Sequence, residues 1–210
     1  MKLNRLKYLL FSPCLFFLEF LFSNSEAQVP KEKSKAEGRL VNGLKEGLWL
    51  FYYPDGKLMA RENYTSGELN GKSYSYYPNG NLSGIENWIE DLQEDSAFFY
   101  HTNGKINRRG IFEKGVYQGV WLSFFENGNL SQKVNYLDGL PDGLSINYFE
   151  SGMIQEEGYY NNGKKDGQFV FYFEMKKSPI SQISNYAEDK ESGVWIYFTP
   201  RGKVENIKRY

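Results

Sequence analysis

Residues 43–64 read GLKEGLWLFYYPDGKLMARENY, and variants of this stretch follow one another down to Tyr210. Seven copies are spaced by about 24 residues and lie at 43–64, 67–88, 91–112, 115–136, 139–160, 163–186 and 189–210. Self-similarity at a fixed period indicates a repeat array in which each copy is one structural unit.

Two columns of glycine recur in these copies. The first lies near the start of a copy, at Gly47, Gly71, Gly119, Gly143, Gly167 and Gly193. The second lies further along, at Gly56, Gly80, Gly104, Gly128, Gly152 and Gly202. Because glycine adopts positive φ without a steric cost, we predict that both columns are structural turn positions at the ends of strands.

Each copy contains two short runs rich in Tyr, Phe, Trp, Val and Ile. They are separated by turn clusters such as Pro54-Asp55-Gly56 and Asn127-Gly128. Asp-Gly and Asn-Gly favour tight turns between strands, whereas each glycine in a helix costs about 1 kcal/mol relative to alanine. We therefore predict an all-β chain in which every copy is a β-hairpin and the array is one long antiparallel meander.

Alternation of side chains along a strand sorts the columns onto two faces of this sheet. The face of Leu50 and Tyr52 is apolar in every copy, so we expect it to pack. The opposite face varies, with Ser73 and Ser75 in one copy and large rings in others. Its candidate binding residues are Trp49, Phe51, Trp121, Phe169, Phe171, Trp195 and Tyr197. If exposed, such rings form apolar patches of the kind that mark binding sites.

The pattern Gly-x-x-x-Gly-x-Trp-x-x-Tyr-Tyr-Pro-Asp-Gly-x-Leu, read from Gly43 to Leu58, resembles the MORN repeat in the variant found in bacterial proteins. The resemblance extends from Gly43 to Tyr210. It implies a row of hairpins that forms one elongated, twisted and curved sheet. It also implies a scaffold that binds proteins or lipids, with no catalytic residue in the repeat. Some bacterial relatives carry an antitoxin label, which fits poorly with the export signal described below.

Two copies depart from the pattern, and the final strand of the last copy is basic. In the third, Asp91 and Asp95 occupy glycine columns, and we expect left-handed backbone to persist there under some strain. In the sixth, residues 174–179 read EMKKSP and form a turn two residues longer, which preserves the strand parity and should protrude as a basic loop. The last copy ends with Lys203, Lys208 and Arg209, which we interpret as protecting a free sheet edge.

The N-terminus resembles a secretory signal peptide over residues 1–27. A basic start, an apolar stretch at 8–22 and Ser25-Glu26-Ala27 as a cleavage site support this interpretation. An uncleaved anchor falls short of the roughly 20 residues needed to span a membrane, and a lipoprotein at Cys14 lacks the expected flanks. Residues 28–37 are predicted to be a flexible lead-in, and residues 38–42 half a repeat that caps the array. We therefore expect a periplasmic, envelope-associated or secreted protein.

The sequence gives little indication of catalysis. His101 is the only histidine, no Cys or His cluster has metal-ligand spacing, and the glycines form no phosphate-binding loop. Glu62 and Glu86 share one column, which places them two strands apart. With 25 basic and 26 acidic residues, the nearly neutral chain lacks the excess of positive charge that nucleic-acid binding requires. We predict no enzyme activity, no cofactor and no metal.

These observations lead to a non-catalytic binding or scaffold protein that recognises a protein partner along its aromatic-rich sheet. A cell-wall or glycan-binding module is the alternative. Membrane association ranks third, because anionic lipid attracts basic clusters that this chain lacks. The identity of the partner, the face that binds it and the oligomeric state stay open at this point.

Overall fold

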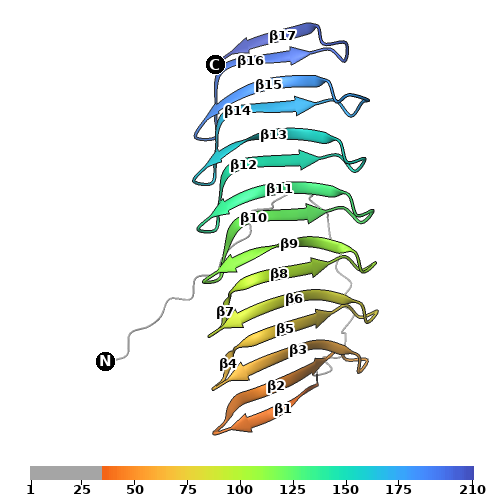
Figure 1. Cartoon of the computed structure of the whole chain (residues 1–210), viewed down its shortest axis with the longest axis vertical. Coiled ribbons are helices and arrows are strands. Elements are labelled where there is room, and N and C mark those ends of the chain that lie inside the picture. The colour runs from red at the N-terminus through yellow and green to blue at the C-terminus, as the bar shows by residue number, and fades with distance from the viewer. Residues whose placement is uncertain (1–34) are drawn as a thin grey trace, which may run out of the picture. The chain divides into compact units, whose positions relative to one another are not determined.

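The computed structural model describes residues 35–210, which form a single open sheet of antiparallel strands (Figure 1). The strands are β1 (Ala36–Val41), β2 (Leu44–Tyr52), β3 (Leu58–Thr65), β4 (Glu68–Leu69), β5 (Gly71–Tyr76), β6 (Leu82–Ile89), β7 (Leu92–Gln93), β8 (Asp95–Tyr100), β9 (Ile106–Glu113), β10 (Val116–Phe124), β11 (Leu130–Leu137), β12 (Leu140–Tyr148), β13 (Ile154–Asn161), β14 (Lys164–Tyr172), β15 (Ile180–Ala187), β16 (Lys190–Phe198) and β17 (Val204–Arg209). Successive strands pair in chain order. Both β4 and β5 pair with β3, and both β7 and β8 pair with β6, so each of these pairs is one strand in two pieces. The predicted all-β meander is confirmed.

The two long edges of the sheet carry different turns. At one edge, Asn42 and Gly43 form a two-residue loop with φ of 51° and 80°. Positive φ at both positions defines the type I′ turn that matches the twist of paired strands. At the other edge, the N–H of Gly56 donates to the carbonyl of Tyr53 (2.9 Å), and Gly56 has φ of 84°. Every glycine of the second column has positive φ at this edge, as predicted.

The first glycine column serves a purpose other than the predicted turn. Gly47 has φ of 69° but lies inside β2, and the pairing with β1 moves from Gly38–Trp49 to Arg39–Glu46 at this point. Gly47 and Leu48 therefore form a β-bulge, which is left-handed backbone that glycine tolerates and which increases the local twist. Gly71 begins β5 as predicted, but the prediction is wrong for Gly47, Gly119, Gly143, Gly167 and Gly193, which lie inside strands, because an irregularity within a strand also needs positive φ.

The degenerate third copy keeps the backbone of its neighbours. Asp91 and Asp95 each have φ of 64°, in the left-handed region that glycine occupies elsewhere. The carboxylate of Asp91 also accepts a hydrogen bond from the N–H of Leu69 in the preceding copy (2.7 Å), which ties this turn to its neighbour. The expectation that the turn persists is confirmed.

The long turn of the sixth copy leaves the register intact. Phe171 pairs with Gln182 and Tyr172 with Ile180, just as Phe51 pairs with Ala60 and Tyr52 with Leu58 in the first copy. Two added residues keep the side chains on their original faces. At the N-terminal end of the array β1 begins at Ala36, two residues earlier than the half repeat predicted at 38–42. The signal peptide predicted at 1–27 lies outside the described residues.

The core lies on one face of the sheet, and it is the face not expected to pack. The buried apolar side chains are Trp49, Ala60, Ala97, Phe112, Trp121, Val134, Phe169 and Trp195, and the buried polar ones are Ser73, Ser145 and Ser184. All follow the alternation of Trp49, so we call this side the Trp49 face and the other side the Leu50 face. Leu50 and its equivalents are half-buried. The prediction that the uniform face packs is wrong, because large rings on the variable face lean over small neighbours.

Candidate functional site

The rings proposed to bind a partner are mostly internal to the sheet. Trp49, Trp121, Phe169 and Trp195 have exposed fractions of 9%, 5%, 1% and 6%. Three of them cover a glycine on the adjacent strand: a Cβ built on Gly38, Gly110 or Gly158 would lie 2.2–2.3 Å from a ring atom. The expectation of an exposed patch is therefore wrong for these four residues.

The indole N–H groups complete the backbone bonding at the bulges. Trp49 Nε1 donates to the carbonyl of Arg39 (3.2 Å), Trp121 Nε1 to that of Ile111 (3.0 Å) and Trp195 Nε1 to that of Asn185 (3.0 Å). Each of these carbonyls lies next to the point where the register shifts. A bulge leaves a backbone carbonyl without its usual N–H donor from the paired strand. The indole N–H of each tryptophan supplies the hydrogen bond that this carbonyl would otherwise lack.

Phe51, Phe171 and Tyr197 are half-buried on the same face. The Nζ of Lys45 lies 4.6 Å from the centroid of the Phe51 ring, and that of Lys208 lies 5.5 Å from the Tyr197 ring. Towards the C-terminus the rings form a continuous stack, with centroids 4.9–5.6 Å apart, through Tyr160, Phe169, Tyr186, Trp195 and Tyr210. The aromatic content of this face is therefore largely accounted for by packing.

Glu62 and Glu86 lie on the Trp49 face, where Glu62 is paired with Trp49 and Glu86 with Ser73. Tyr64 donates its hydroxyl proton to Glu62 (2.5 Å), and Gln93 donates to Glu86. Burial raises the pKa of Glu86, and the hydrogen bond from Gln93 and then the Arg108 guanidinium oppose this shift. The Glu62 bond therefore lies within β3, whereas the Glu86 bond joins β6 to β7.

His101 substitutes for a tyrosine of the second edge. Tyr53 and Tyr77 donate their hydroxyls to the carbonyls of Tyr76 and Tyr100, both at 2.6 Å. In the third copy His101 Nε2 lies 2.8 Å from the carbonyl of Phe124 and makes the equivalent link. The histidine is thus a connector between copies. Among residues 35–210, no group of three or more His, Cys, Asp and Glu side chains is placed to hold a metal ion.

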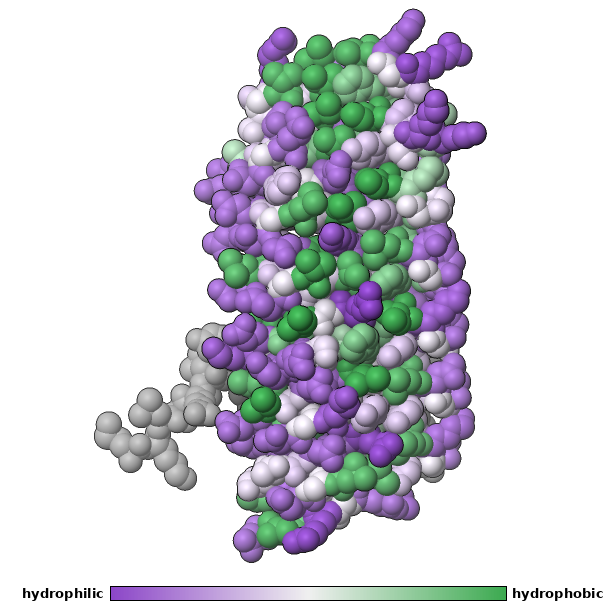
Figure 2. Space-filling view, in the orientation of Figure 1, coloured by the Kyte–Doolittle hydropathy of each residue, from purple (hydrophilic) through white to green (hydrophobic). Residues whose placement is uncertain are grey.

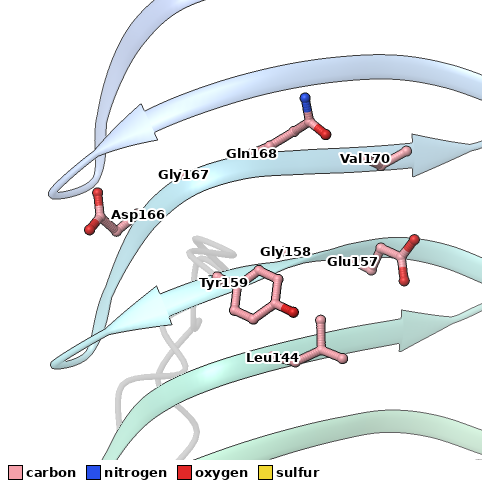
Figure 3. Close-up of a pocket in the computed structure, with 8 residues that line it drawn as sticks. All are labelled: Leu144, Glu157, Gly158, Tyr159, Asp166, Gly167, Gln168 and Val170. Atoms are coloured by element: carbon pink, nitrogen blue, oxygen red, sulfur yellow. The ribbon is translucent and has the colours of Figure 1, made fainter.

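A hollow lies on the Leu50 face, over β12, β13 and β14 (Figure 3). It has a volume of about 500 Å³, and its lining includes Leu144, Glu157, Tyr159, Asp166 and Val170. Tyr159 is 57% exposed. Tyr172 donates its hydroxyl to Glu157 (2.5 Å), and burial followed by this bond raises the pKa of Tyr172 to about 12.

The sequence interpretation missed Tyr159, although a signal was available. Its column holds asparagine in four other copies, at Asn63, Asn87, Asn135 and Asn185. These asparagines donate to carbonyls of the next strand, at Lys72, Ser96, Asp142 and Val194. Tyr159 replaces that structural amide with an exposed ring. An exposed ring at this position is available to contact a binding partner.

Other apolar side chains on the Leu50 face are also open to solvent. Exposed fractions are 46% for Leu48, 50% for Ile111 and 48% for Val120. Figure 2 shows one face of the molecule, with apolar side chains along the middle and polar ones along both long edges. A sheet that buries its rings on one side thus leaves aliphatic side chains exposed on the other.

The comparison with protein families agrees with this architecture. The model described as MORN repeat variant matches residues 45–66, 69–90, 117–138 and 141–162. The chain is built from MORN-variant repeats. The four matched MORN repeats begin two residues after the starts predicted here. The third, sixth and seventh copies lie outside the matches but form the same hairpins.

Two further comparisons add little to the family match. No curated protein matches the sequence. Among solved structures, the crystal structure of a GtfA/B complex bound to UDP and GlcNAc is similar over 63% of this chain and 25% of that one, with 12% identity and a TM-score of 0.27. The MORN-repeat chain therefore spans about a quarter of that protein. Within residues 35–210, no helix is long and apolar enough to cross a membrane.

Proposed function

We propose that this MORN-variant protein is a non-catalytic scaffold that binds a protein partner on its Leu50 face. The observation that carries the proposal is Tyr159, whose ring is 57% exposed at the rim of a hollow lined by Leu144 and Val170. An exposed tyrosine beside aliphatic groups is typical of an anchor residue in a protein interface. The binding surface proposed from the sequence is therefore moved to the opposite side of the sheet.

The face as a whole supports a partner that extends along the array. Ile111 and Val120 are further exposed apolar side chains on this face, nearer the N-terminus than the hollow, and charged side chains such as Arg109, Lys133 and Glu157 lie on the same face. Both signs are present in a chain of formal net charge −1, so the surface lacks the basic cluster that anionic lipid attracts. Export to the periplasm or cell surface, inferred from residues 1–27, is part of the same proposal.

Glycan binding is the second candidate, because Tyr159 lies near Glu157, Asp166 and Gln168, and a ring beside hydrogen-bonding groups suits a sugar. Photo-crosslinking separates the two functions. A benzophenone amino acid is placed at Tyr159 or Ile111, with Leu137, which is 53% exposed at a turn edge, as the control position. We expect a discrete protein adduct from the first two positions and none from Leu137.

A substitution completes the test. Tyr159→Asn introduces the residue that four other copies hold, so the fold should be unaffected while the adduct formed at Ile111 decreases. An adduct that survives Tyr159→Asn would contradict the proposal. An adduct that disappears on glycosidase treatment would favour the glycan alternative.

A further inference from the structure

The hollow beside Tyr159 carries a negative charge on either side of the ring. Glu157 lies two residues before Tyr159 on β13, and Asp166 lies on β14. Figure 3 shows the Tyr159 ring between these two carboxylates. Leu144 and Val170 contribute the aliphatic part of the lining, and no lysine or arginine of residues 35–210 lines it. The hollow therefore combines an exposed ring, aliphatic groups and two carboxylates without a basic residue.

The carboxylate of Asp166 is free of a structural bond that its counterparts make. In four other copies the side chain of this column accepts a hydrogen bond from the first N–H of the next two-residue turn. The pairs are Glu46 with Ser66 (2.9 Å), Glu94 with Lys114 (2.7 Å), Gln118 with Asp138 (3.1 Å) and Asp142 with Asn162 (3.0 Å). Within residues 35–210 the Asp166 carboxylate accepts only from the amide of Asn161 (3.5 Å). In the turn that follows, Asp189 makes the link between copies by accepting a backbone N–H of β14 (2.8 Å), so Asp166 remains available.

Glu157 is an acid in a column that is otherwise basic or aliphatic. Its counterparts in the other copies are Arg61, Ile85, Arg109, Lys133, Ile183 and Ile207. One oxygen of Glu157 accepts the hydroxyl of Tyr172 (2.5 Å), and the second oxygen can accept further bonds. Neither Glu157 nor Asp166 forms a salt bridge within residues 35–210, and the nearby Lys164 is paired with Glu188 (3.2 Å). Both carboxylates therefore lack a cation within this part of the chain.

We propose that the hollow binds a basic segment of the partner, with lysine or arginine side chains at Glu157 and Asp166 on either side of the Tyr159 ring. This assignment rests on the protein-binding role proposed above. Lysine and arginine pack their aliphatic stems on apolar surface while the charged head reaches a carboxylate, and a cation over a tyrosine ring is itself attracted. Arg109 and Lys133 continue the Glu157 column towards the N-terminus and repel such a segment, which confines it to the hollow.

The spacing of the two carboxylates suits an extended segment. Asp166 is adjacent to Lys165, whose pairing partner Tyr160 lies three residues after Glu157. Three residues of a strand span about 10 Å, and alternate residues of an extended chain are about 7 Å apart on one side. A segment with arginine at alternate positions therefore presents a guanidinium to each carboxylate within the reach of its long side chains.

Fluorescence anisotropy with labelled peptides and the full chain tests this inference. The probe is a fluorescein-labelled peptide of alternating arginine and serine, and its counterpart has glutamate in place of arginine. We expect only the arginine peptide to bind, and to bind more weakly as the salt concentration rises, because salt screens ion pairs at a partly exposed site. Glu157→Gln/Asp166→Asn should raise its dissociation constant about tenfold, since two attractive contacts are lost.

The variants are chosen so that the fold is kept. Glutamine at 157 still accepts the Tyr172 hydroxyl, and asparagine at 166 keeps the shape of the aspartate. Glu126→Gln/Glu150→Gln is the matched control, because it removes the same charge from exposed acids at the turns after β10 and β12. This control should bind the arginine peptide as the wild type does.

Three results would overturn the inference: no binding of the arginine peptide at about 1 mM, equal binding of both peptides, or an equal loss in the control double variant. The crosslink from Ile111 separates this outcome from the proposed function. A protein adduct that decreases in Tyr159→Asn but not in Glu157→Gln/Asp166→Asn would retain the protein-binding role and remove the basic segment. A decrease in both variants would support the two together.

Discussion

The indole ring of Trp121 lies directly over Gly110, so a Cβ built on that glycine would be 2.2 Å from ring atom Cδ2. Gly38 and Gly158 have the same relationship to Trp49 and Phe169. In this single-layer sheet a large ring is buried by lying across an adjacent strand that has no side chain. The ring and the glycine therefore form a matched pair, and neither can be changed alone without a loss of packing.

Gly110→Ala should lower the free energy of unfolding by about 1–3 kcal/mol, because the added methyl group displaces a ring held at its edges by Phe112 and Tyr117. Urea denaturation measures this change. Gly84→Ala is the matched control, since its Cβ would meet the rotatable hydroxyl of Ser75 at 2.7 Å and should cost less. Equal losses at the two glycines would argue against the matched pair.

Trp121→Phe should destabilise the chain by about 1–3 kcal/mol, because the carbonyl of Ile111 loses its donor beside the bulge. Trp88→Phe is the control, because the indole N–H of Trp88 is buried with no hydrogen-bond partner among the described residues. The same ring truncation should therefore cost less at Trp88. If Trp88→Phe proves as costly as Trp121→Phe, the indole bond has little effect on stability.

Asp95→Gly should stabilise the third copy by about 0.5–1 kcal/mol, since φ of 64° is strained for aspartate and free of strain for glycine. Asp91→Gly relieves the same φ but removes the acceptor for the N–H of Leu69, so its gain should be smaller or absent. Thermal unfolding of the two variants measures the difference. A larger gain at Asp91 would contradict this explanation.

Glu86 makes stability depend on pH in a defined direction. Burial raises its pKa in the folded state, so the folded chain binds more protons than the unfolded chain between the unfolded pKa and the raised one. Stability contributed by this group is therefore greatest below the unfolded pKa and falls as the pH rises through the folded pKa. Glu86→Gln should remove this loss and be more stable than the wild type at neutral pH.

The comparison of unfolding midpoints between acidic and neutral pH checks this prediction. Glu62→Gln is the matched control on the same face, because its carboxylate is held by the Tyr64 hydroxyl. A pH dependence that persists in Glu86→Gln would assign the effect to another group.

Much of the architecture follows from local chemistry that the sequence displays. Asp-Gly, Asn-Gly and Pro-Asp-Gly clusters fix the turns because their residues tolerate positive φ, and constant spacing carries the hairpin from copy to copy. The same reasoning was sufficient for Asp91 and Asp95, whose φ values match the glycines they replace, and for the longer turn before Ile180, which keeps the register.

The sequence by itself determined the hairpins, their number and the columns of side chains on each face. Only the tertiary structure decided which face is the core. Alternation separates Trp49 from Leu50 but assigns neither to the interior, because burial in a single-layer sheet depends on the twist added by the bulges at Gly47 and its equivalents. It depends equally on the small residue that lies beside each ring in the adjacent strand, a neighbour 11 residues away for Gly38 and Trp49.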